Sequence, residues 1–523
     1  MKQRPNFIVI HTDQHRFDCV GINNRRKGIY TPYLDTIGNM GANFTACYSN
    51  CPLCIPQRMS FLTGLTPEHH GLLSNIGIPY FPMETSLPTE MRRGSYQTAM
   101  VGRTMHTYPA NESYGFEYYL PGDPSSENKD TTDAFFKYLR DNNSDETGGY
   151  YGNGINNNSR AAAPFHLSDE FHQSKWTVNR AMDFLDNHDP SRPFMLFVGF
   201  YAPHSPHNPP VEYFNRYYNR EDLDNPAIGD WEIPPVNSGN FMSSYINLKD
   251  EELRAARAGY YGNISFLDAQ VGRLLTNPMI AFGCNTYVIF TSDHGEMLGD
   301  HYMYHKSRPY EGSSHLPLCI MGPGISDNQT IDAPVGWHDL MPTILDLAGL
   351  EIPSSVDGRS IAPLLRGEGT STPWRKYMHG ETVHNFFGEV KTRPVDPRHN
   401  FYYEKGTQYL TDGKIKYIWH ITSGLEQLFD LSSDPNELHD LSQEQEWQSV
   451  LEKWRADLVK ELENRPEGFS DGKDLIPGRE VMKVSPEIDK LIDQRQAEGF
   501  RLAYTFGGKN PIAKMEYENN LMN

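Results

Sequence analysis

The sequence contains no hydrophobic run long enough to cross a membrane. Its longest strongly apolar stretch, residues 194–202, is far shorter than the roughly 20 residues that a membrane-spanning helix needs. The first residues also lack the apolar core and the small-residue cleavage site of a signal peptide. We therefore expect a cytoplasmic protein without membrane attachment.

Basic residues are scarce relative to acidic ones. The chain has 47 Lys and Arg against 67 Asp and Glu, which gives a formal net charge of −20. A negative surface repels nucleic-acid phosphates, so this composition argues against a nucleic-acid partner. With 38% hydrophobic and 22% charged residues, the chain has the composition of a folded globular protein.

Cysteine is also rare, with six among 523 residues. So few cysteines do not build a disulfide scaffold, and we expect reduced thiols. Cys51 and Cys54 form a Cys-x-x-Cys pair, which permits a redox or a zinc interpretation. A zinc site of this kind needs a second pair, and Cys284 and Cys319 stand far apart. We therefore disfavour both interpretations.

Short apolar runs alternate with helical patterns along most of the chain. Strands are predicted at residues 7–10, 194–200 and 287–290, and a helix is predicted at residues 250–277. This alternation predicts an α/β fold with a large, mainly parallel sheet between layers of helices. Sites in such folds lie beyond the carboxyl ends of the strands, so Asp13, His204 and Asp293 are expected at one edge.

The pattern changes after about residue 370. Apolar runs at 408–410 and 415–421 flank Asp412-Gly413, which predicts a tight hairpin, and an amphipathic helix is predicted at 443–464. These features indicate a smaller antiparallel α+β domain. The expected organisation is a catalytic domain at 1–370, a C-terminal domain at 371–464 and an extension at 465–523 that serves packing or a homo-oligomer contact.

Two pairs of polar residues follow predicted strands, namely Asp13-Gln14 and Asp293-His294. A single Asp at a strand end is as often a helix cap or a turn residue as a ligand. Two such pairs at one sheet edge, however, suit a hard divalent cation bound through oxygen.

The segment from Cys54 to Arg58 reads Cys-x-Pro-x-Arg, and Thr63-Gly64 follows it. This pattern resembles the signature of the sulfatase family, and spaced matches extend over residues 5–441. The resemblance implies an alkaline-phosphatase-like fold and oxidation of Cys54 to formylglycine (3-oxoalanine) by a maturase. Gln57 stands where most family members have Ser.

The resemblance also implies roles for further residues. It identifies the ligands of a calcium ion as Asp13, Gln14, Cys54, Asp293 and His294. It identifies the catalytic residues as Cys54, Arg58, Arg103, His106, His204 and Lys306. Arg103 replaces a lysine of the family, which keeps the positive charge but does not readily lend a proton. His204 contacts the sulfate in this scheme and protonates the leaving oxygen.

Sulfate-ester hydrolysis through formylglycine uses both hydroxyls of the hydrated aldehyde. In the mechanism that the resemblance implies, one hydroxyl attacks sulfur and the other expels sulfate afterwards. Two alternatives stay open: a phosphonate monoester hydrolase or phosphodiesterase with the same apparatus, and a non-catalytic protein that binds sulfated glycans with Cys54 as a thiol.

The predicted substrate is a sulfated mono- or oligosaccharide, of the kind found in glycosaminoglycans, rather than an aryl or steroid sulfate. The segment 379–403 is rich in Arg, His and aromatic residues for an acidic protein. Arg393 and Arg398 could pair there with a uronate carboxylate or a second sulfate, since guanidinium groups suit planar anions. The alternative is that both arginines are solvated loop residues.

Overall fold

The structure is a computed structural model. It describes residues 4–23, 28–75, 85–105, 113–124, 133–142, 149–155, 158–235, 244–280, 285–368, 373–383 and 404–482. His106, Cys284, Arg393 and Arg398 lie outside the described residues.

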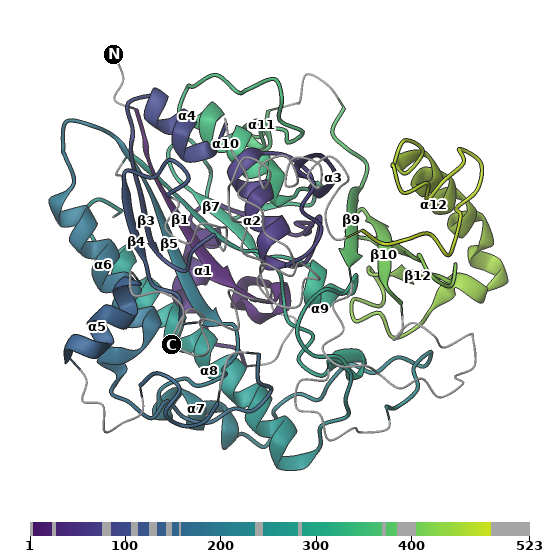
Figure 1. Cartoon of the computed structure of the whole chain (residues 1–523), viewed down its shortest axis with the longest axis horizontal. Coiled ribbons are helices and arrows are strands. Elements are labelled where there is room, and N and C mark those ends of the chain that lie inside the picture. Colours follow the sequence, from purple (N-terminus) through teal and green to yellow (C-terminus); the bar gives the residue numbers. More distant parts are fainter. Residues whose placement is uncertain are drawn as a thin grey trace, which may run out of the picture.

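An eight-stranded sheet forms the centre of the molecule (Figure 1), and its strands lie in the order β4-β3-β5-β1-β6-β7-β2-β8. The strands are β1 (Asn6–Asp13), β2 (Ala42–Phe44), β3 (Gln97–Gly102), β4 (Tyr118–Pro121), β5 (Phe194–Pro203), β6 (Thr286–Ser292), β7 (Leu318–Met321) and β8 (Gln329–Ile331). Neighbouring strands run parallel except at β7, which is antiparallel to both β6 and β2. The mainly parallel sheet and the three strands predicted within it are confirmed.

Helices cover both faces of this sheet because its central strands carry apolar side chains on both sides. In β1, Phe7 and Val9 belong to one core, whereas Ile8 and Ile10 belong to the core on the opposite face. The first face is covered by α2 (Cys54–Thr63), α4 (Leu87–Arg93) and α10 (Leu340–Leu347). The other is covered by α1 (Pro32–Asn39), α6 (Gln173–Asn187) and α8 (Asp250–Leu275), the helix predicted at 250–277. The remaining helices of this part are α3 (Pro67–His70), α5 (Ala134–Asn142), α7 (Val211–Tyr218), α9 (Glu311–Ser314) and α11 (Ala362–Leu365).

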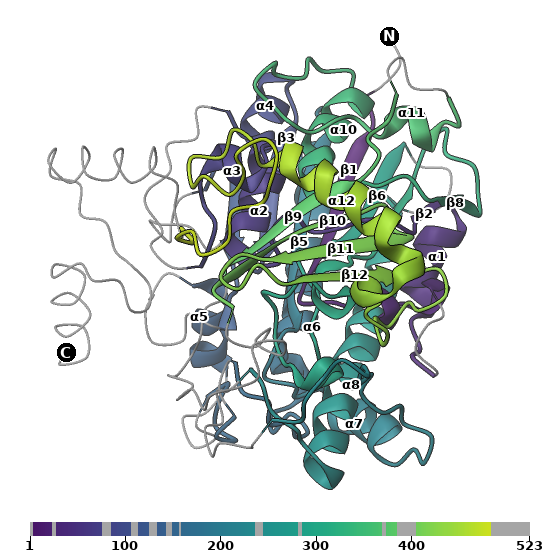
Figure 2. The same cartoon turned by 90° about the vertical axis from the view of Figure 1, so that its right-hand side faces the viewer.

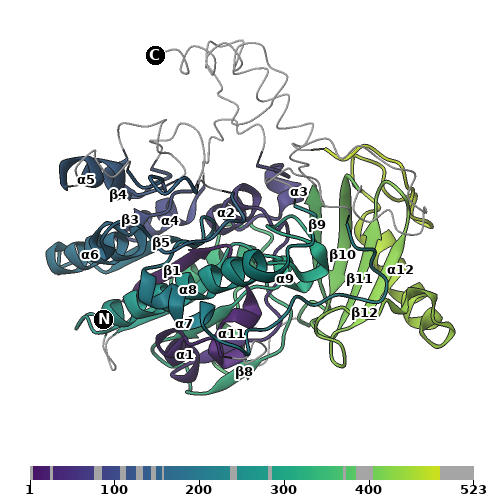
Figure 3. The same cartoon turned by 90° about the horizontal axis from the view of Figure 1, so that it is seen from below.

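A second, antiparallel sheet of four strands lies beside the large one (Figure 3). Its strands, in the order β12-β11-β10-β9, are β9 (Met378–Val383), β10 (Gly406–Thr411), β11 (Ile415–His420) and β12 (Glu426–Asp430). The helix α12 (Gln448–Glu461) lies across this sheet (Figure 2), where Trp454 and Leu458 share a core with Trp419. The predicted hairpin is confirmed: Gly413 has a φ of 83°, and the Asp412 carboxylate accepts hydrogen bonds from the amides of Lys414 and Ile415.

The first part of the C-terminal extension packs on this second sheet. Phe469 belongs to the same core as Trp419, and Arg465 forms a 2.8 Å ion pair with Glu381. The homo-oligomer contact and the domain boundaries stay predictions, and residues 483–523 lie outside the described residues. Among the helices that the structure describes, none is long and apolar enough to span a membrane.

Candidate active site

Four adjacent strands end at one edge of the large sheet, and each end presents a polar residue. Asp13 is the last residue of β1, while Arg103, His204 and Asp293 directly follow β3, β5 and β6. The ends of β3 and β5 approach closely: a Cβ on Gly102, which has a φ of 95°, would lie 2.1 Å from the neighbouring carbonyl oxygen of β5. The structure therefore brings Asp13, His204 and Asp293 to a common edge.

Cys54 is the first residue of α2, so the amino end of this helix faces the same edge. The side chain is buried, and its Sγ lies 3.1 Å from His294 Nε2. Free amide groups at a helix N-terminus favour an anion. Burial and Asp13 raise the pKa of the Cys54 thiol, but Lys306 and His294 outweigh them and the net pKa is lowered. Cys51 does not contact these residues, since its Sγ donates a hydrogen bond to the Leu73 carbonyl instead.

Two arginines neutralise the buried carboxylates of Asp13 and Asp293. The Arg58 Nη2 atom lies 2.6 Å from Asp13 Oδ2 and 2.9 Å from Asp293 Oδ2. The Arg103 Nε atom lies 2.9 Å from Asp13 Oδ2. Burial raises the pKa of Asp13, but the guanidinium groups of Arg103 and Arg58 hold it well below its usual value. Burial and Asp13 raise the pKa of Asp293, but His294 and Arg58 outweigh them and the net pKa is lowered, so both acids are carboxylates in the folded protein.

These carboxylates fit a bound cation. Both Oδ2 atoms face the arginines, whereas Asp13 Oδ1 is buried and has no hydrogen-bond partner among the described residues. One ligand atom from each of Asp13, Cys54, Asp293 and His294 lies within 4.8 Å of the others. A buried anionic oxygen without a partner is costly unless a cation compensates it, so this donor set fits a divalent metal ion.

Gln14 lies at the edge of this group and links it to Lys306. Its Oε1 atom accepts a 2.8 Å hydrogen bond from Lys306 Nζ, and its amide NH₂ donates to Glu296. The Lys306 ammonium also lies 2.7 Å from His204 Nε2. An ammonium group can only donate, so His204 Nε2 accepts and the other ring nitrogen carries the proton. That nitrogen, Nδ1, donates to the Ser205 carbonyl at 2.7 Å.

The hydrogen bonds of His204 differ from its predicted role as the residue that protonates the leaving oxygen. Burial and Lys306 lower the pKa of His204 well below its usual value, in agreement with a neutral ring. The proton that faces the site is therefore on Lys306 in this arrangement, and His204 is its acceptor.

Sequence reasoning missed four residues of the site. Asp123 forms a second ion pair with Arg103, and the Arg103 guanidinium lies 4.5 Å from the ring centre of Tyr201. His11 lies 3.7 Å from Asp293, and Glu296 binds Gln14. Three of the four lie close in sequence to predicted site residues: His11 is two residues before Asp13, Tyr201 is three residues before His204, and Glu296 is three residues after Asp293.

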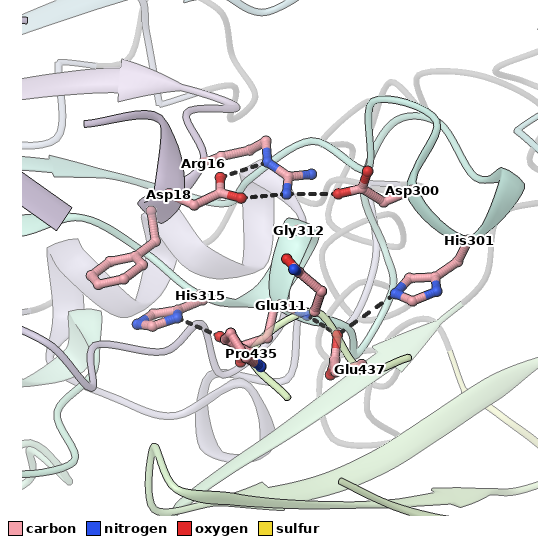
Figure 4. Close-up of a pocket in the computed structure, with 11 residues that line it drawn as sticks. Arg16, Asp18, Asp300, His301, Glu311, Gly312, His315, Pro435 and Glu437 are labelled. Atoms are coloured by element: carbon pink, nitrogen blue, oxygen red, sulfur yellow. Dashed lines mark hydrogen bonds and ion pairs between the residues drawn. The ribbon is translucent and has the colours of Figure 1, made fainter. Parts of the chain in front are cut away.

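The segment that carries Lys306 is held by buried charges, and Figure 4 shows part of this network around a cavity of about 10 Å³. Arg16 pairs with Asp18 at 2.7 Å and with Asp300 at 2.8 Å. On the other side of the cavity, His301 lies 3.9 Å from Glu437, which belongs to the C-terminal part of the chain.

Lys416 of β11 connects this segment to the second sheet. Its side chain is fully buried, and Nζ lies 2.8 Å from Glu311 and 3.1 Å from Glu437. The same ammonium donates a 2.9 Å hydrogen bond to the Pro309 carbonyl, three residues after Lys306. One cation thus compensates two buried glutamates and fixes the chain next to Lys306.

We expect Lys416→Met to destabilise the fold by about 3–5 kcal/mol, because it removes the ammonium group that lies between two buried carboxylates. Urea unfolding monitored by fluorescence measures this loss. Lys414→Met is the matched control: this lysine of the same hairpin is 65% exposed and lies 3.4 Å from Asp332. Equal unfolding midpoints for both variants would contradict a stabilising role of Lys416.

Solved structures with this fold include a phosphonate monoester hydrolase of Agrobacterium radiobacter, with a TM-score of 0.69 and 24% identity over 87% of this chain and 95% of that chain. Another was solved in complex with D-glucosamine-2-N,6-O-disulfate, with a TM-score of 0.68 and 21% identity over 88% of this chain and 98% of that chain. These likenesses confirm the alkaline-phosphatase-like fold.

The sequence comparisons identify the family. A protein-family model described as N-sulphoglucosamine sulphohydrolase, C-terminal, matches residues 299–464. An arylsulfatase of Clostridium perfringens is 36% identical over 91% of this chain and 98% of its own length. The sulfatase model matches residues 5–350, which include both carboxylate pairs and the Cys-x-Pro-x-Arg segment. The chain therefore belongs to the sulfatase family and is a hydrolase of sulfate esters.

Proposed function

We propose that the protein hydrolyses sulfate esters with formylglycine, made from Cys54, as the nucleophile and with a calcium ion beside it. The observation that carries this proposal is the position of Cys54, at the amino end of α2 and within 4.8 Å of a buried carboxylate group that fits a cation. Formylglycine supplies a hydrated aldehyde, whose two hydroxyls permit both attack on sulfur and release of sulfate. Calcium supplies positive charge that offsets the sulfate oxygens.

The residues around Cys54 have separate tasks in this proposal. Asp13, Asp293 and the side-chain oxygen of Gln14, together with His294, would hold the metal ion. Arg58 holds both carboxylates in place through its bonds to their Oδ2 atoms.

Positive charge in the site comes from three groups. Arg103 and Lys306 present cations, and the amino end of α2 adds its backbone amides, so the arrangement favours a tetrahedral anion. The Lys306 ammonium is the proton source for the leaving oxygen, since His204 Nε2 is occupied as its acceptor. His106 keeps its predicted role in this scheme as a further cationic contact, although it lies outside the described residues.

The proposal requires a maturase that oxidises Cys54. Both Cys54 and Gln57 are buried in the folded protein, and Gln57 Oε1 accepts a 2.9 Å hydrogen bond from Ser49. A maturase must bind the surrounding segment in its own active site, and the burial of Cys54 and Gln57 in the folded protein prevents this, so we infer that the modification precedes folding.

The proposed substrate is a sulfated mono- or oligosaccharide. Support comes from the related structure solved with a disulfated glucosamine and from the model named for N-sulphoglucosamine sulphohydrolase, which matches the C-terminal part. The Clostridium relative is named an arylsulfatase, which keeps an aryl sulfate as the alternative. The phosphonate monoester hydrolase with the same fold keeps a phosphonate as a second alternative.

We expect the highest kcat/KM on a sulfated hexosamine or a sulfated unsaturated disaccharide, at least tenfold above an aryl sulfate and a phosphonate monoester. Arg393→Ala and Arg398→Ala should each raise KM about tenfold for a sulfated sugar that also carries a uronate carboxylate or a second sulfate, because each removes a guanidinium group proposed to pair with that anion. The aryl sulfate serves as the control, since it lacks a second anionic group. If the aryl sulfate is the best substrate and neither arginine matters, the carbohydrate assignment fails while the sulfatase assignment stands.

A further inference from the structure

The main chain of Gln14 is fixed on both sides. Its N–H donates a 3.2 Å hydrogen bond to Asp293 Oδ1, and its carbonyl accepts a 2.7 Å bond from the Tyr260 hydroxyl. The residue has a φ of 69°, an unusual conformation for a side chain other than glycine. Because the backbone is held, the side-chain amide is the part of Gln14 that can still change orientation. Either its oxygen or its NH₂ group can face the site.

The two ends of an amide have nearly the same shape but opposite hydrogen-bonding character. On the side of Asp13 and Asp293, the Gln14 amide faces the Lys306 ammonium and the position proposed for the metal ion. Both of these cations require an oxygen from the amide. A 180° rotation of the amide would present NH₂ to these cations. The cations alone favour the correct orientation, and a hydrogen-bond acceptor behind the amide would reinforce it.

Glu296 supplies that acceptor. Its Oε2 atom accepts the bond from the Gln14 NH₂ group, and its Oε1 atom accepts a 2.9 Å bond from the Leu298 amide and a further bond from the His305 amide. Arg16 fixes the backbone of the same residue by donating to its carbonyl at 2.7 Å. Glu296 is buried and both of its side-chain oxygens accept hydrogen bonds, so as a carboxylate it has no donor to offer to a rotated amide.

We propose that Glu296 is a positioning residue that orients the Gln14 amide, so that its oxygen faces Lys306 and the metal site. This inference rests on the proposed metal site but concerns a residue that would not touch the metal. It also implies that the residues at positions 14 and 296 depend on each other. An amide at position 14 needs an acceptor behind it, whereas a carboxylate at position 14 has two equivalent oxygens and would be repelled by Glu296.

The test is a pair of Glu296→Gln substitutions, one in the natural chain and one in a Gln14→Asp background. The substitution keeps the size of the side chain and an oxygen for the Leu298 and His305 amides, but it turns an NH₂ group towards Gln14. Two donors then face each other, and the Gln14 amide rotates. Calcium affinity is measured by isothermal titration calorimetry, and thermal unfolding is measured separately in the presence of a chelator.

We expect Glu296→Gln to weaken calcium binding about tenfold or more in the natural chain, as is usual when the partner of a metal ligand is lost. In the Gln14→Asp background it should leave the affinity unchanged or raise it, because it removes a repulsion. Equal losses in both backgrounds would overturn the proposal, since Glu296 would then serve only the loop amides. No loss in either background would overturn it as well.

The unfolding measurement separates this inference from the metal assignment. With the chelator present, Glu296→Gln should lower the unfolding temperature in the natural chain but not in the Gln14→Asp background. If the natural chain binds no calcium yet this difference is found, the metal assignment fails and the orientation of Gln14 by Glu296 stands. The absence of any difference would contradict the orientation itself.

Discussion

Replacement of Cys54 by alanine is expected to leave a folded protein whose sulfatase turnover is reduced on the order of 10⁴- to 10⁶-fold, as for other enzymes that lose their nucleophile. The Cys54 side chain is small and its Sγ contacts His294, so the fold loses little. Cys54→Ser should be equally inactive where no maturase oxidises serine, because one hydroxyl cannot both attack sulfur and expel sulfate. Turnover of a sulfate ester and circular dichroism measure the two properties.

Cys51→Ala is the matched control for this prediction. Cys51 belongs to the same Cys-x-x-Cys pair and is also buried, but it is not among the residues that could hold a metal ion. The control should keep turnover within a few-fold of the natural protein. Comparable turnover by Cys54→Ala and the natural protein would exclude Cys54 as the source of the nucleophile.

Asp13→Asn is expected to weaken calcium binding by about two orders of magnitude or more and to abolish most activity with it. The substitution removes a formal charge from a hard-cation site and leaves the buried cations Arg58 and Arg103 with less compensation. Asp293→Asn should act in the same direction. Calorimetry measures the calcium affinity. The calcium dependence of activity is measured as turnover after chelation and after calcium is added back, and only the natural protein should recover its full activity.

Asp123→Asn is the control that distinguishes an effect on the metal site from an effect on Arg103. Asp123 pairs with Arg103 but is not part of the group that could hold a metal. We expect reduced turnover with calcium affinity close to that of the natural protein. Activity that is indifferent to exhaustive chelation would count against the whole metal assignment.

The strands around the site could be predicted because their signals are local. The apolar runs of β1, β5 and β6 are buried on both faces, and polar residues begin where each strand leaves the core. The Asp412-Gly413 turn is equally local, since glycine adopts the positive φ that the hairpin needs. The reversed direction of β7 was not predicted, because strand direction depends on connections rather than on residue pattern.

The long-range partners could not be predicted for a related reason. Asp123 reaches Arg103 from a loop after β4, and Lys416 reaches Glu311 from the other sheet. Nothing in the sequence near these residues shows which charge they neutralise. The roles of Lys306 and His204 were carried by family resemblance, and only the hydrogen bond between them indicates which one holds the proton.

Mass spectrometry of the peptide that contains Cys54, from protein made in its native host, tests the central claim most directly. We predict a peptide in which the side chain of Cys54 has lost its sulfur and carries an aldehyde that reacts with a hydrazide. Turnover of the same preparation should scale with the fraction of peptide in this form. A fully active preparation in which Cys54 is entirely an unmodified thiol would contradict the account.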